Sequence, residues 1–327
     1  MRVLLLGATG TIGLATAKAL LSGGHEVVCL VRNKAGVKGS WSAEKTRELL
    51  AGTQVRFADV LSVEAVQKHG LQGEYFDAVV SCLASRTGTP RDAWAIDYQA
   101  HSQLLKLVQA VGIRQFVLLS AICVQKPLLG FQQAKLAFEK ELIESGLTYS
   151  IVRPTAFFKS LSGQMQRLKQ GKPFLLFGDG RLTSCKPISD HDLGYFIASC
   201  LNDAAKHNRI LPIGGPGEAI TPLQQAEYLF KLLGKTPKYK HIPVRLLDVI
   251  IGVLKTLGAL IPPLADKAEL ARIGRYYATE SMLVWNTQTH AYDAQATPSF
   301  GTQTLFAHYE ELAAGQADVQ LGDHAVF

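Results

Sequence analysis

The chain has 327 residues, of which 47% are hydrophobic and 19% are charged, and its net charge is +7. These values are typical of a soluble globular protein with one large α/β domain, or with a nucleotide-binding domain and a smaller lobe. The basic residues are scattered, which argues against nucleic-acid binding, and the positive charge suits small anionic ligands. No CxxC or HExxH pattern occurs, so we expect no metal site, and we expect most of the five widely spaced cysteines to be reduced.

The first thirteen residues predict a strand, a glycine-rich turn and the start of a helix. Arg2 to Leu6 is an apolar run too short for a helix, and apolar residues recur at helical spacing from Ile12 to Leu21. A bare backbone at such a turn lets a pyrophosphate approach the free N–H groups of the helix. The spacing G-x-x-G-x-x-G resembles that of the short-chain dehydrogenase/reductase superfamily; the alternative is a glycine turn that binds nothing. We expect contacts with a dinucleotide from Gly7, Thr9, Gly10, Thr11, Ile12 and Gly13.

The second strand, His25 to Val31, ends at Arg32, Asn33 and Lys34. Sites that prefer NAD usually place an acid here to bind the ribose 2′-hydroxyl, and this chain places two cations instead. An acid would repel a 2′-phosphate, whereas a guanidinium binds it through two hydrogen bonds. We therefore expect NADPH as the cofactor, bound by these three residues, with a solvated Arg32 as the alternative.

Further strands alternate with helices as far as residue 153, which predicts a Rossmann-type α/β fold with a doubly wound parallel sheet. The strands are Gln54–Phe57, Phe76–Cys82, Gln115–Ser120 and Thr148–Arg153, and a long helix is expected over about 94–111. Asp59 stands where the superfamily often places an acid next to the adenine, and it could equally cap a helix that starts near Val63; both roles can coexist. Because ligands gather at the carboxyl ends of parallel strands, we expect a second group of residues at the cofactor: Asp59, Val60, Cys82, Leu83, Ala84, Ser85, Pro154, Ala156 and Phe157.

The residues after the fifth strand carry the main departure from a carbonyl reductase. Short-chain reductases that act on carbonyls use a Ser after this strand and a Tyr-x-x-x-Lys on the next helix. Ser120 and Lys135 fit this pattern, but Phe131 stands in place of the tyrosine. A phenyl ring cannot protonate a developing alkoxide. Either the protein is not an enzyme, or its substrate generates no alkoxide.

We expect a nucleotide-binding domain over residues 1–156, with elements around 186–215 returning to it, and a mainly substrate-binding lobe over 157–327. The segment 171–180 is hairpin-like, and Ser189 with Asp192 predicts a capping box that opens a helix over Leu193–Leu201. The segment Leu246–Leu264 is apolar but too interrupted for a membrane span. It is either a buried helix or an amphipathic face that rests on a membrane.

Several segments together resemble one family more closely than they resemble the superfamily. They are Phe131-Gln-Gln-Ala-Lys135, Phe157-Phe-Lys-Ser-Leu161, Phe177-Gly-Asp-Gly180, Cys185-Lys-Pro-Ile-Ser189 and Tyr276-Tyr-Ala-Thr-Glu-Ser-Met282. These look like segments of the divinyl chlorophyllide 8-vinyl reductases, in the atypical branch of the superfamily, and the similarity spans nearly the whole chain. The resemblance implies NADPH-dependent reduction of the C8 vinyl group of a magnesium tetrapyrrole, divinyl chlorophyllide or protochlorophyllide, to ethyl. Such a step belongs to chlorophyll or bacteriochlorophyll synthesis.

The resemblance also implies site roles and a location. A vinyl group conjugated to a macrocycle spreads the developing charge, so the missing tyrosine is expected. Lys135, with Ser120 nearby, is expected to hold the nicotinamide ribose. Plant members carry transit peptides, whereas this chain starts on a core strand, so we expect a bacterial, cytoplasmic protein, with contact at the periphery of photosynthetic membranes left open. The pigment is expected to contact Phe131, Phe157, Phe158 and Lys159.

Two alternatives stay open. One is another atypical reductase of the isoflavone-reductase type, which also keeps the lysine without a uniform tyrosine. The other is a NADPH sensor or assembly factor, like some NmrA-like relatives, which binds the cofactor but turns nothing over. The segments beyond residue 157 favour the vinyl reductases. The sequence pattern does not predict an oligomeric state.

Overall fold

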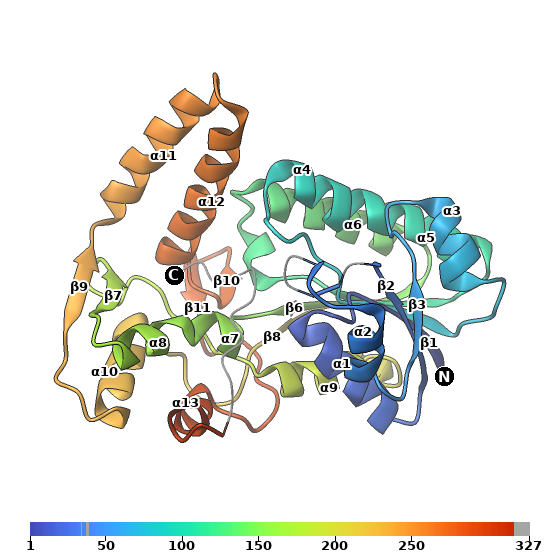
Figure 1. Cartoon of the computed structure of the whole chain (residues 1–327), viewed down its shortest axis with the longest axis horizontal. Coiled ribbons are helices and arrows are strands. Elements are labelled where there is room, and N and C mark those ends of the chain that lie inside the picture. The colour runs from blue at the N-terminus through green and yellow to red at the C-terminus, as the bar shows by residue number, and fades with distance from the viewer. Residues whose placement is uncertain (34, 37–38, 317–327) are drawn as a thin grey trace.

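A computed structural model describes residues 1–33, 35–36 and 39–316, so Lys34, expected at the cofactor, lies outside the described residues. Seven parallel strands form one sheet in the order β3-β2-β1-β4-β5-β6-β8, which confirms the doubly wound α/β fold (Figure 1). The strands are β1 (Arg2–Leu6), β2 (Glu26–Val31), β3 (Gln54–Phe57), β4 (Ala78–Ser81), β5 (Gln115–Leu119), β6 (Thr148–Pro154) and β8 (Arg209–Ile213).

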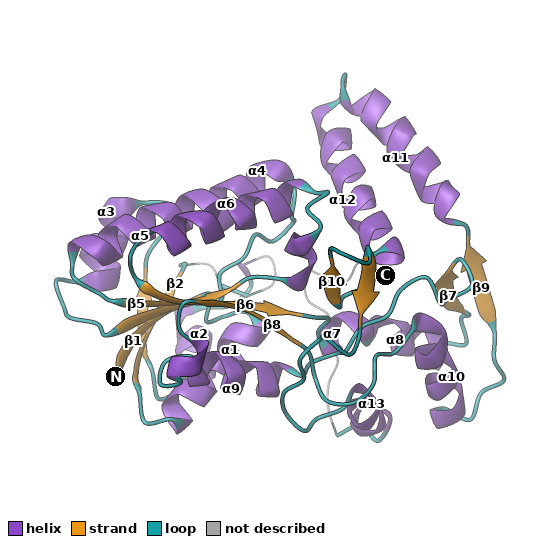
Figure 2. Ribbon diagram, turned by 180° about the vertical axis from the view of Figure 1, so that it is seen from behind, coloured by secondary structure: helices purple, strands orange, loops and turns teal. Residues whose placement is uncertain are grey.

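The sheet is covered on both faces, and its central strands β1, β4 and β5 are buried at nearly every position. In β1, Val3 and Leu5 belong to one core cluster, and Leu4 and Leu6 belong to another on the opposite face. Figure 2 shows α1 (Thr11–Ser22) and α9 (Asp190–Ser199) below the sheet and α5 (His101–Ala110) and α6 (Gly130–Glu144) above it. Continuous apolar runs of this kind are typical of strands buried on both faces.

Several boundaries differ from the sequence-based expectations. The helix expected over 94–111 begins earlier, because α4 (Pro90–Ala93), η3 (Trp94–Ala100) and α5 follow one another without a break. Helix α9 starts three residues earlier than expected. Ser189 caps it by accepting from the Asp192 N–H at 3.0 Å, but the carboxylate of Asp192 accepts from Thr302 and Gln303 N–H groups at 3.1 Å instead of completing a capping box.

Shorter helical segments complete the nucleotide-binding part. Helix α3 (Val63–Ala65) is capped by Ser62, whose Oγ accepts from the Ala65 N–H at 3.1 Å, so the expectation that Asp59 caps it is wrong. Asp59 instead accepts from the Leu61 N–H at 3.0 Å, because the turn between them brings this donor closer. The remaining segments are α2 (Ala43–Leu49), η2 (Val66–Leu71), η4 (Ile122–Gln125) and η5 (Ala204–Lys206).

A third core cluster organises the C-terminal lobe. It joins Phe158, Phe174, Phe230 and Tyr309, of which the first and the last are more than 150 residues apart in the sequence. The hairpin expected over 171–180 is wrong: β7 (Phe174–Phe177) pairs in parallel with β9 (Tyr239–Ile242). The other elements of this part are α7 (Phe158–Leu161), α8 (Gly163–Lys169), α10 (Pro222–Leu232), α13 (Leu305–Ala313) and the antiparallel pair β10 (Val284–Asn286) and β11 (Ala291–Asp293).

Helices α11 (Val244–Gly258) and α12 (Pro262–Thr279) form a hairpin that projects from the lobe (Figure 1). The alternative that Leu246–Leu264 is a buried helix is wrong, since α11 has no buried residue. Its apolar residues divide between half-buried positions, such as Leu247 and Leu254, and exposed positions, such as Val249 and Val253. In the described part of the chain, no helix combines the length and the apolar character needed to cross a bilayer.

Candidate functional site

The turn between β1 and α1 is built so that only glycine fits at two of its positions. Gly7 has a φ of +71°, and a Cβ there would lie 2.5 Å from the Cys82 carbonyl carbon. A Cβ on Gly13 would lie 2.1 Å from the Gly7 carbonyl oxygen. The turn therefore packs this closely against the loop after β4 and against the first turn of α1 only because positions 7 and 13 have no side chain, as the glycine motif predicts.

The N-terminus of α1 is open to an anion. Gly10 is its N-cap, no side chain caps the helix, and its first turn holds no acid. The first N–H groups of a helix have no partner within it, and the helix dipole favours negative charge there. The ammonium of Lys159, at the start of α7, donates to Thr11 Oγ1 at 2.9 Å. Lys159, expected at the pigment, therefore lies beside the expected pyrophosphate position.

The ends of β2 and β3 carry the residues expected at the adenosine half of the cofactor. Arg32 and Asn33 are exposed at the carboxyl end of β2, and Asp59 is exposed after β3. Val60 packs at the edge of the second core cluster. The side chains of Arg32 and Asn33 are therefore accessible to a ligand at this edge of the sheet.

The loop after β4 is held by the helix that follows it. Ser81 Oγ lies 2.8 Å from His101 Nε2, and His101 Nδ1 lies 2.8 Å from the Ile96 carbonyl oxygen. Burial lowers the pKa of His101 to about 4, so the imidazole is neutral, with Nδ1–H donating to the carbonyl and Nε2 accepting from the serine. The Leu83 N–H reaches Ser81 Oγ at 3.3 Å. This anchoring fixes the backbone expected to pass the cofactor.

Two further residues of this loop have defined environments. Burial raises the pKa of the Cys82 thiol to about 12, so it stays a neutral thiol, and its Sγ lies 3.5 Å from Thr16 Oγ1 on α1. The Ser85 N–H donates to Asp97 Oδ1 at 3.2 Å. The loop is thus tied to α1 on one side and to η3 on the other.

Asp97 forms an ion pair with Lys135. The ammonium of Lys135 lies 2.9 Å from Asp97 Oδ1, and the two side chains are 12% and 0% exposed. The second oxygen, Asp97 Oδ2, is buried without a hydrogen-bond partner among the described residues. Sequence reasoning missed Asp97. The available signal was an acid inside a helical stretch, Trp94–Ala100, that otherwise packs on the core.

Ser120 directly follows β5 and contacts Glu139, which lies one helical turn beyond Lys135 on α6. Its hydroxyl donates to Glu139 Oε1, and the carboxylate of Glu139 is also paired with Arg153. Ser120 and Glu139 are both buried. The serine proton is therefore committed to this carboxylate, and the structure does not bring Ser120 into hydrogen-bond contact with Lys135.

Phe131 lies one turn before Lys135 on α6 and belongs to a fourth core cluster with Ile122, Ile273 and Tyr276. The Tyr276 hydroxyl donates to the Cys123 carbonyl oxygen at 2.9 Å, and burial raises the pKa of this phenol. Tyr276 is thus a packing residue whose proton is already donated. The position that holds a tyrosine in carbonyl reductases is an apolar wall.

The residues directly after β6 connect the sheet to the lobe. Pro154 ends β6, the Ala156 carbonyl accepts from the Ile188 N–H at 2.9 Å, and Phe157 packs on the first core cluster. Phe158 is buried in the core of the lobe, in a different cluster from Phe131. Its contact with a pigment, like that of Phe157, stays a prediction.

Comparisons with known proteins agree with this geometry. A family model described as NAD(P)H-binding matches residues 7–204. The divinyl chlorophyllide a 8-vinyl-reductase of Cucumis sativus is 50% identical over 332 aligned positions, covering 99% of this chain and 79% of that protein. The enzyme of the same name from Arabidopsis thaliana is 47% identical, with the same coverage. The chain belongs to the divinyl chlorophyllide a 8-vinyl-reductase family. This confirms the expected family.

A more distant relative of the vinyl-reductase family is the photosystem II assembly factor Ycf39 of Synechocystis, which is 30% identical over 50% of this chain and 47% of that protein. Among solved structures, an NADPH-dependent quinone oxidoreductase from Escherichia coli matches with a TM-score of 0.64 at 20% identity, covering 95% of this chain and 99% of that one. A UDP-glucuronic acid 4-epimerase from Bacillus cereus, bound to NAD, matches with a TM-score of 0.67 at 16% identity, covering 100% of this chain and 98% of that one. These two likenesses show the fold that this chain shares with them.

Proposed function

We propose that this protein uses NADPH to reduce the C8 vinyl group of a divinyl magnesium tetrapyrrole, divinyl chlorophyllide or protochlorophyllide, to an ethyl group. The observation that carries the proposal is the 50% identity, over 99% of the chain, to a protein named for this reaction. The local chemistry supports it, because Lys135 is kept beside the cofactor loop while Phe131 replaces the usual acid.

The residues present fit a phosphorylated dinucleotide. The glycine turn and the uncapped N-terminus of α1 would hold the pyrophosphate, and the ammonium of Lys159 would add a positive charge beside it. Arg32 and Asn33 would hold the 2′-phosphate at the end of β2. When bound, NADPH supplies a hydride from its nicotinamide. The ion pair with Asp97 would keep Lys135 in place to bind the hydroxyls of the nicotinamide ribose.

Addition of hydride to the terminal carbon of the vinyl group places negative charge on the inner carbon, from which it spreads into the macrocycle. A proton then adds to that carbon and completes the ethyl group. This path needs no oxyanion donor, so the apolar wall formed by Phe131 does not block it. His101 is neutral and buried, and the Tyr276 proton is committed to the Cys123 carbonyl oxygen, so neither donates the proton. We propose Lys135 or water as its source.

We assign the pigment to the side of the site where the part of the chain after residue 157 faces α6, with Phe131 and Phe157 nearest to the ring, since a flat, largely apolar tetrapyrrole needs an apolar cleft. We assign Lys159 to the pyrophosphate, because its ammonium donates to Thr11 Oγ1. We also propose that the protein meets a membrane only at its periphery. Placement in a bacterial cytoplasm stays a prediction.

A spectroscopic assay tests the proposal. Purified protein is mixed with NADPH and divinyl chlorophyllide, and the Soret absorption should shift to the blue as the vinyl group leaves the conjugated system. Under the same conditions NADH should support a slower reaction. Binding of NADPH with no spectral change on any divinyl pigment would favour a non-catalytic role, as in a cofactor-binding assembly factor.

A further inference from the structure

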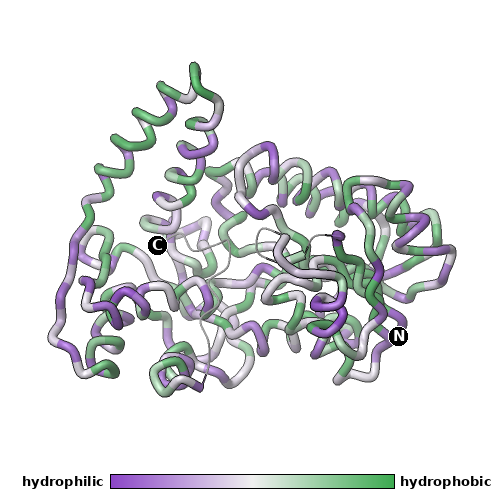
Figure 3. Tube along the Cα trace, viewed as in Figure 1, coloured by the Kyte–Doolittle hydropathy of each residue, from purple (hydrophilic) through white to green (hydrophobic). Residues whose placement is uncertain are grey.

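The outer face of the α11–α12 hairpin is a continuous apolar surface. Along α11 it follows the helical spacing of one face, and it continues over the turn to α12. Its members are 39% to 84% exposed, with the highest value at the turn: Leu246, Val249, Ile250, Val253, Leu257, Leu260 and Ile261. We call this set the α11 face. Figure 3 shows this apolar colouring along the part of the hairpin that projects furthest from the rest of the chain.

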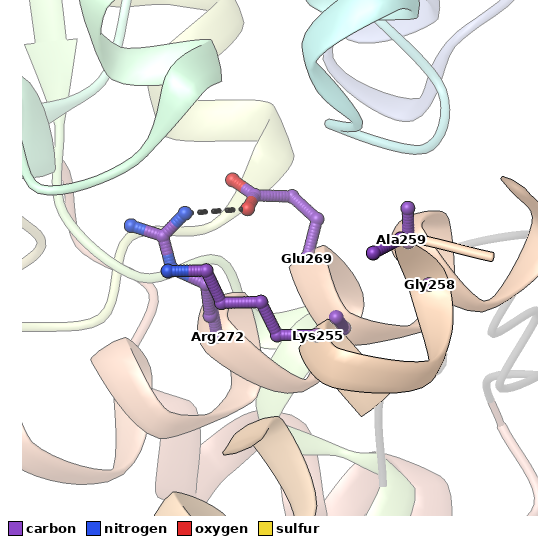
Figure 4. Close-up of a pocket in the computed structure, with 7 residues that line it drawn as sticks. Lys255, Gly258, Ala259, Glu269 and Arg272 are labelled. Atoms are coloured by element: carbon purple, nitrogen blue, oxygen red, sulfur yellow. Dashed lines mark hydrogen bonds and ion pairs between the residues drawn. The ribbon is translucent and has the colours of Figure 1, made fainter. Parts of the chain in front are cut away.

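The hairpin is a fixed unit, so the α11 face is permanently presented. A Cβ on Gly258 would lie 2.8 Å from the Ala265 backbone nitrogen, which shows how closely the two helices cross near the turn. Figure 4 shows the space between them, where Glu269 and Arg272 of α12 face each other and Lys255 and Gly258 come from α11. Asp248 of α11 is paired with Arg275 of α12. These contacts hold the apolar residues of α11 outward.

The charges around the α11 face are mainly positive. Residues 238–275 contain seven Lys or Arg and three Asp or Glu, so this segment has a net charge of +4 out of +7 for the chain. Two of the three acids are already paired, Asp248 with Arg275 and Glu269 with Arg272 at 2.8 Å. Arg245 and Lys255 are exposed on α11 itself. An apolar stripe flanked by unneutralised cations is complementary to a surface of apolar chains and anionic head groups.

We propose that the α11 face lies in the surface of a lipid bilayer that contains anionic lipids, with its apolar residues below the head groups. The helix is too short and too charged to span, and a helix of this pattern is stable in the interface plane. A second copy of the chain is a poorer occupant, because it would bring two segments of net charge +4 together.

This surface is connected to the candidate active site through α12. The carboxylate of Glu269 on α12 accepts from the Gly130 N–H at 3.4 Å, and Gly130 starts α6, the helix that carries Lys135. On the next turn, Ile273 packs in the same cluster as Phe131. A pigment dissolved in the membrane would thus enter close to the site without crossing water. That last step rests on the proposed function; the lipid binding does not.

Vesicle flotation tests the proposal with the full chain. Vesicles of phosphatidylcholine alone are compared with vesicles that contain about 30 mol% phosphatidylglycerol, at low and high salt. The triple variant Val249→Glu, Val253→Glu, Leu257→Glu places charges on the α11 face, and all three sites are exposed. The matched control, Leu61→Glu with Tyr75→Glu, places charges on exposed apolar residues of the nucleotide-binding part.

We expect the unaltered protein and the control to float with the anionic vesicles and the triple variant to stay at the bottom. Arg245→Ser and Lys255→Ser should each weaken binding roughly fivefold. The proposal would be overturned if the triple variant floated as well as the unaltered protein, or if the unaltered protein did not float. It would also be overturned if the free protein formed a dimer that the triple variant abolished. With pigment dissolved in detergent, the triple variant should keep its turnover, so failure to bind lipid is distinguishable from failure of the proposed reaction.

Discussion

The ammonium of Lys135 and the carboxylate of Asp97 form an ion pair of 2.9 Å in which the aspartate side chain is fully buried. The two residues come from different helices, α6 and η3. Because a buried charge needs its partner, each residue of this pair fixes the position of the other. The pair lies beside the loop that follows β4, since Asp97 also accepts from the Ser85 N–H.

Replacing Lys135 with alanine should lower kcat/KM about tenfold to a thousandfold, or roughly 1.4–4 kcal/mol of barrier, because the cofactor loses its positioning cation. Steady-state kinetics with NADPH and a divinyl pigment measure the change. Lys140→Ala is the control, since Lys140 is an exposed lysine on the same helix. Unchanged kinetics for Lys135→Ala would remove this residue from the active site.

Replacing Asp97 with asparagine should leave the Lys135 charge without its partner. We expect the free energy of unfolding to fall by about 3–5 kcal/mol, as when one partner of a buried ion pair is removed. The double variant Asp97→Asn with Lys135→Met should recover part of this loss, because no unpaired charge remains. Denaturant titration measures all three variants. A double variant that is less stable than both single variants would show that the pair is not the main interaction here.

Replacing Arg32 with aspartate should weaken NADPH selectively, because a carboxylate repels the 2′-phosphate and accepts hydrogen bonds from the 2′-hydroxyl of NADH. We expect the ratio of kcat/KM for NADPH to that for NADH to fall at least about tenfold. Lys106→Asp makes the same charge change at an exposed position of α5 and should leave the ratio as it is. An unchanged ratio for Arg32→Asp would refute the assignment of the end of β2 to the 2′-phosphate.

His101 should make the native state sensitive to acid. Burial lowers its pKa from 6.5 to about 4 in the folded chain, so the unfolded chain takes up the proton first as the pH falls. The contribution of the neutral His101 to the free energy of unfolding is fully present above pH 6.5. It is lost as the pH falls from 6.5 to about 4, and the loss amounts to about 3 kcal/mol. Unfolding titrations across this window should show a shallower slope for His101→Gln. Equal slopes would mean that His101 is not protonated on unfolding.

The sequence was sufficient for the sheet because its signal is local. Val3 to Leu6 and Ala78 to Ser81 are buried on both faces, and such runs identify parallel strands without knowledge of their partners. The glycine turn was predictable for the same reason, since the strand, turn and helix are contiguous. Ser120 and Lys135 were proposed as site residues from their spacing after the fifth strand, and their roles stay predictions.

Features that depend on distant contacts were not predictable. β7 pairs with β9, which follows it by more than 60 residues, and nothing in either strand identifies the other. The partner of Lys135 is Asp97, and the partner of Ser120 is Glu139, and both pairs arise only when the helices pack on the sheet. The sequence could not predict the exposure of α11 for a related reason. An apolar helical face has the same sequence pattern whether protein or lipid covers it.

The central claim is that hydride passes from NADPH to a carbon–carbon double bond conjugated with a tetrapyrrole. The most direct test uses NADPH deuterated at both C4 positions, with divinyl chlorophyllide in ordinary water, and mass spectrometry of the pigment. The account predicts one deuterium in the terminal carbon of the new ethyl group and one hydrogen from solvent on the inner carbon. An ethyl group without deuterium, or oxidation of NADPH with the vinyl group intact, would contradict it.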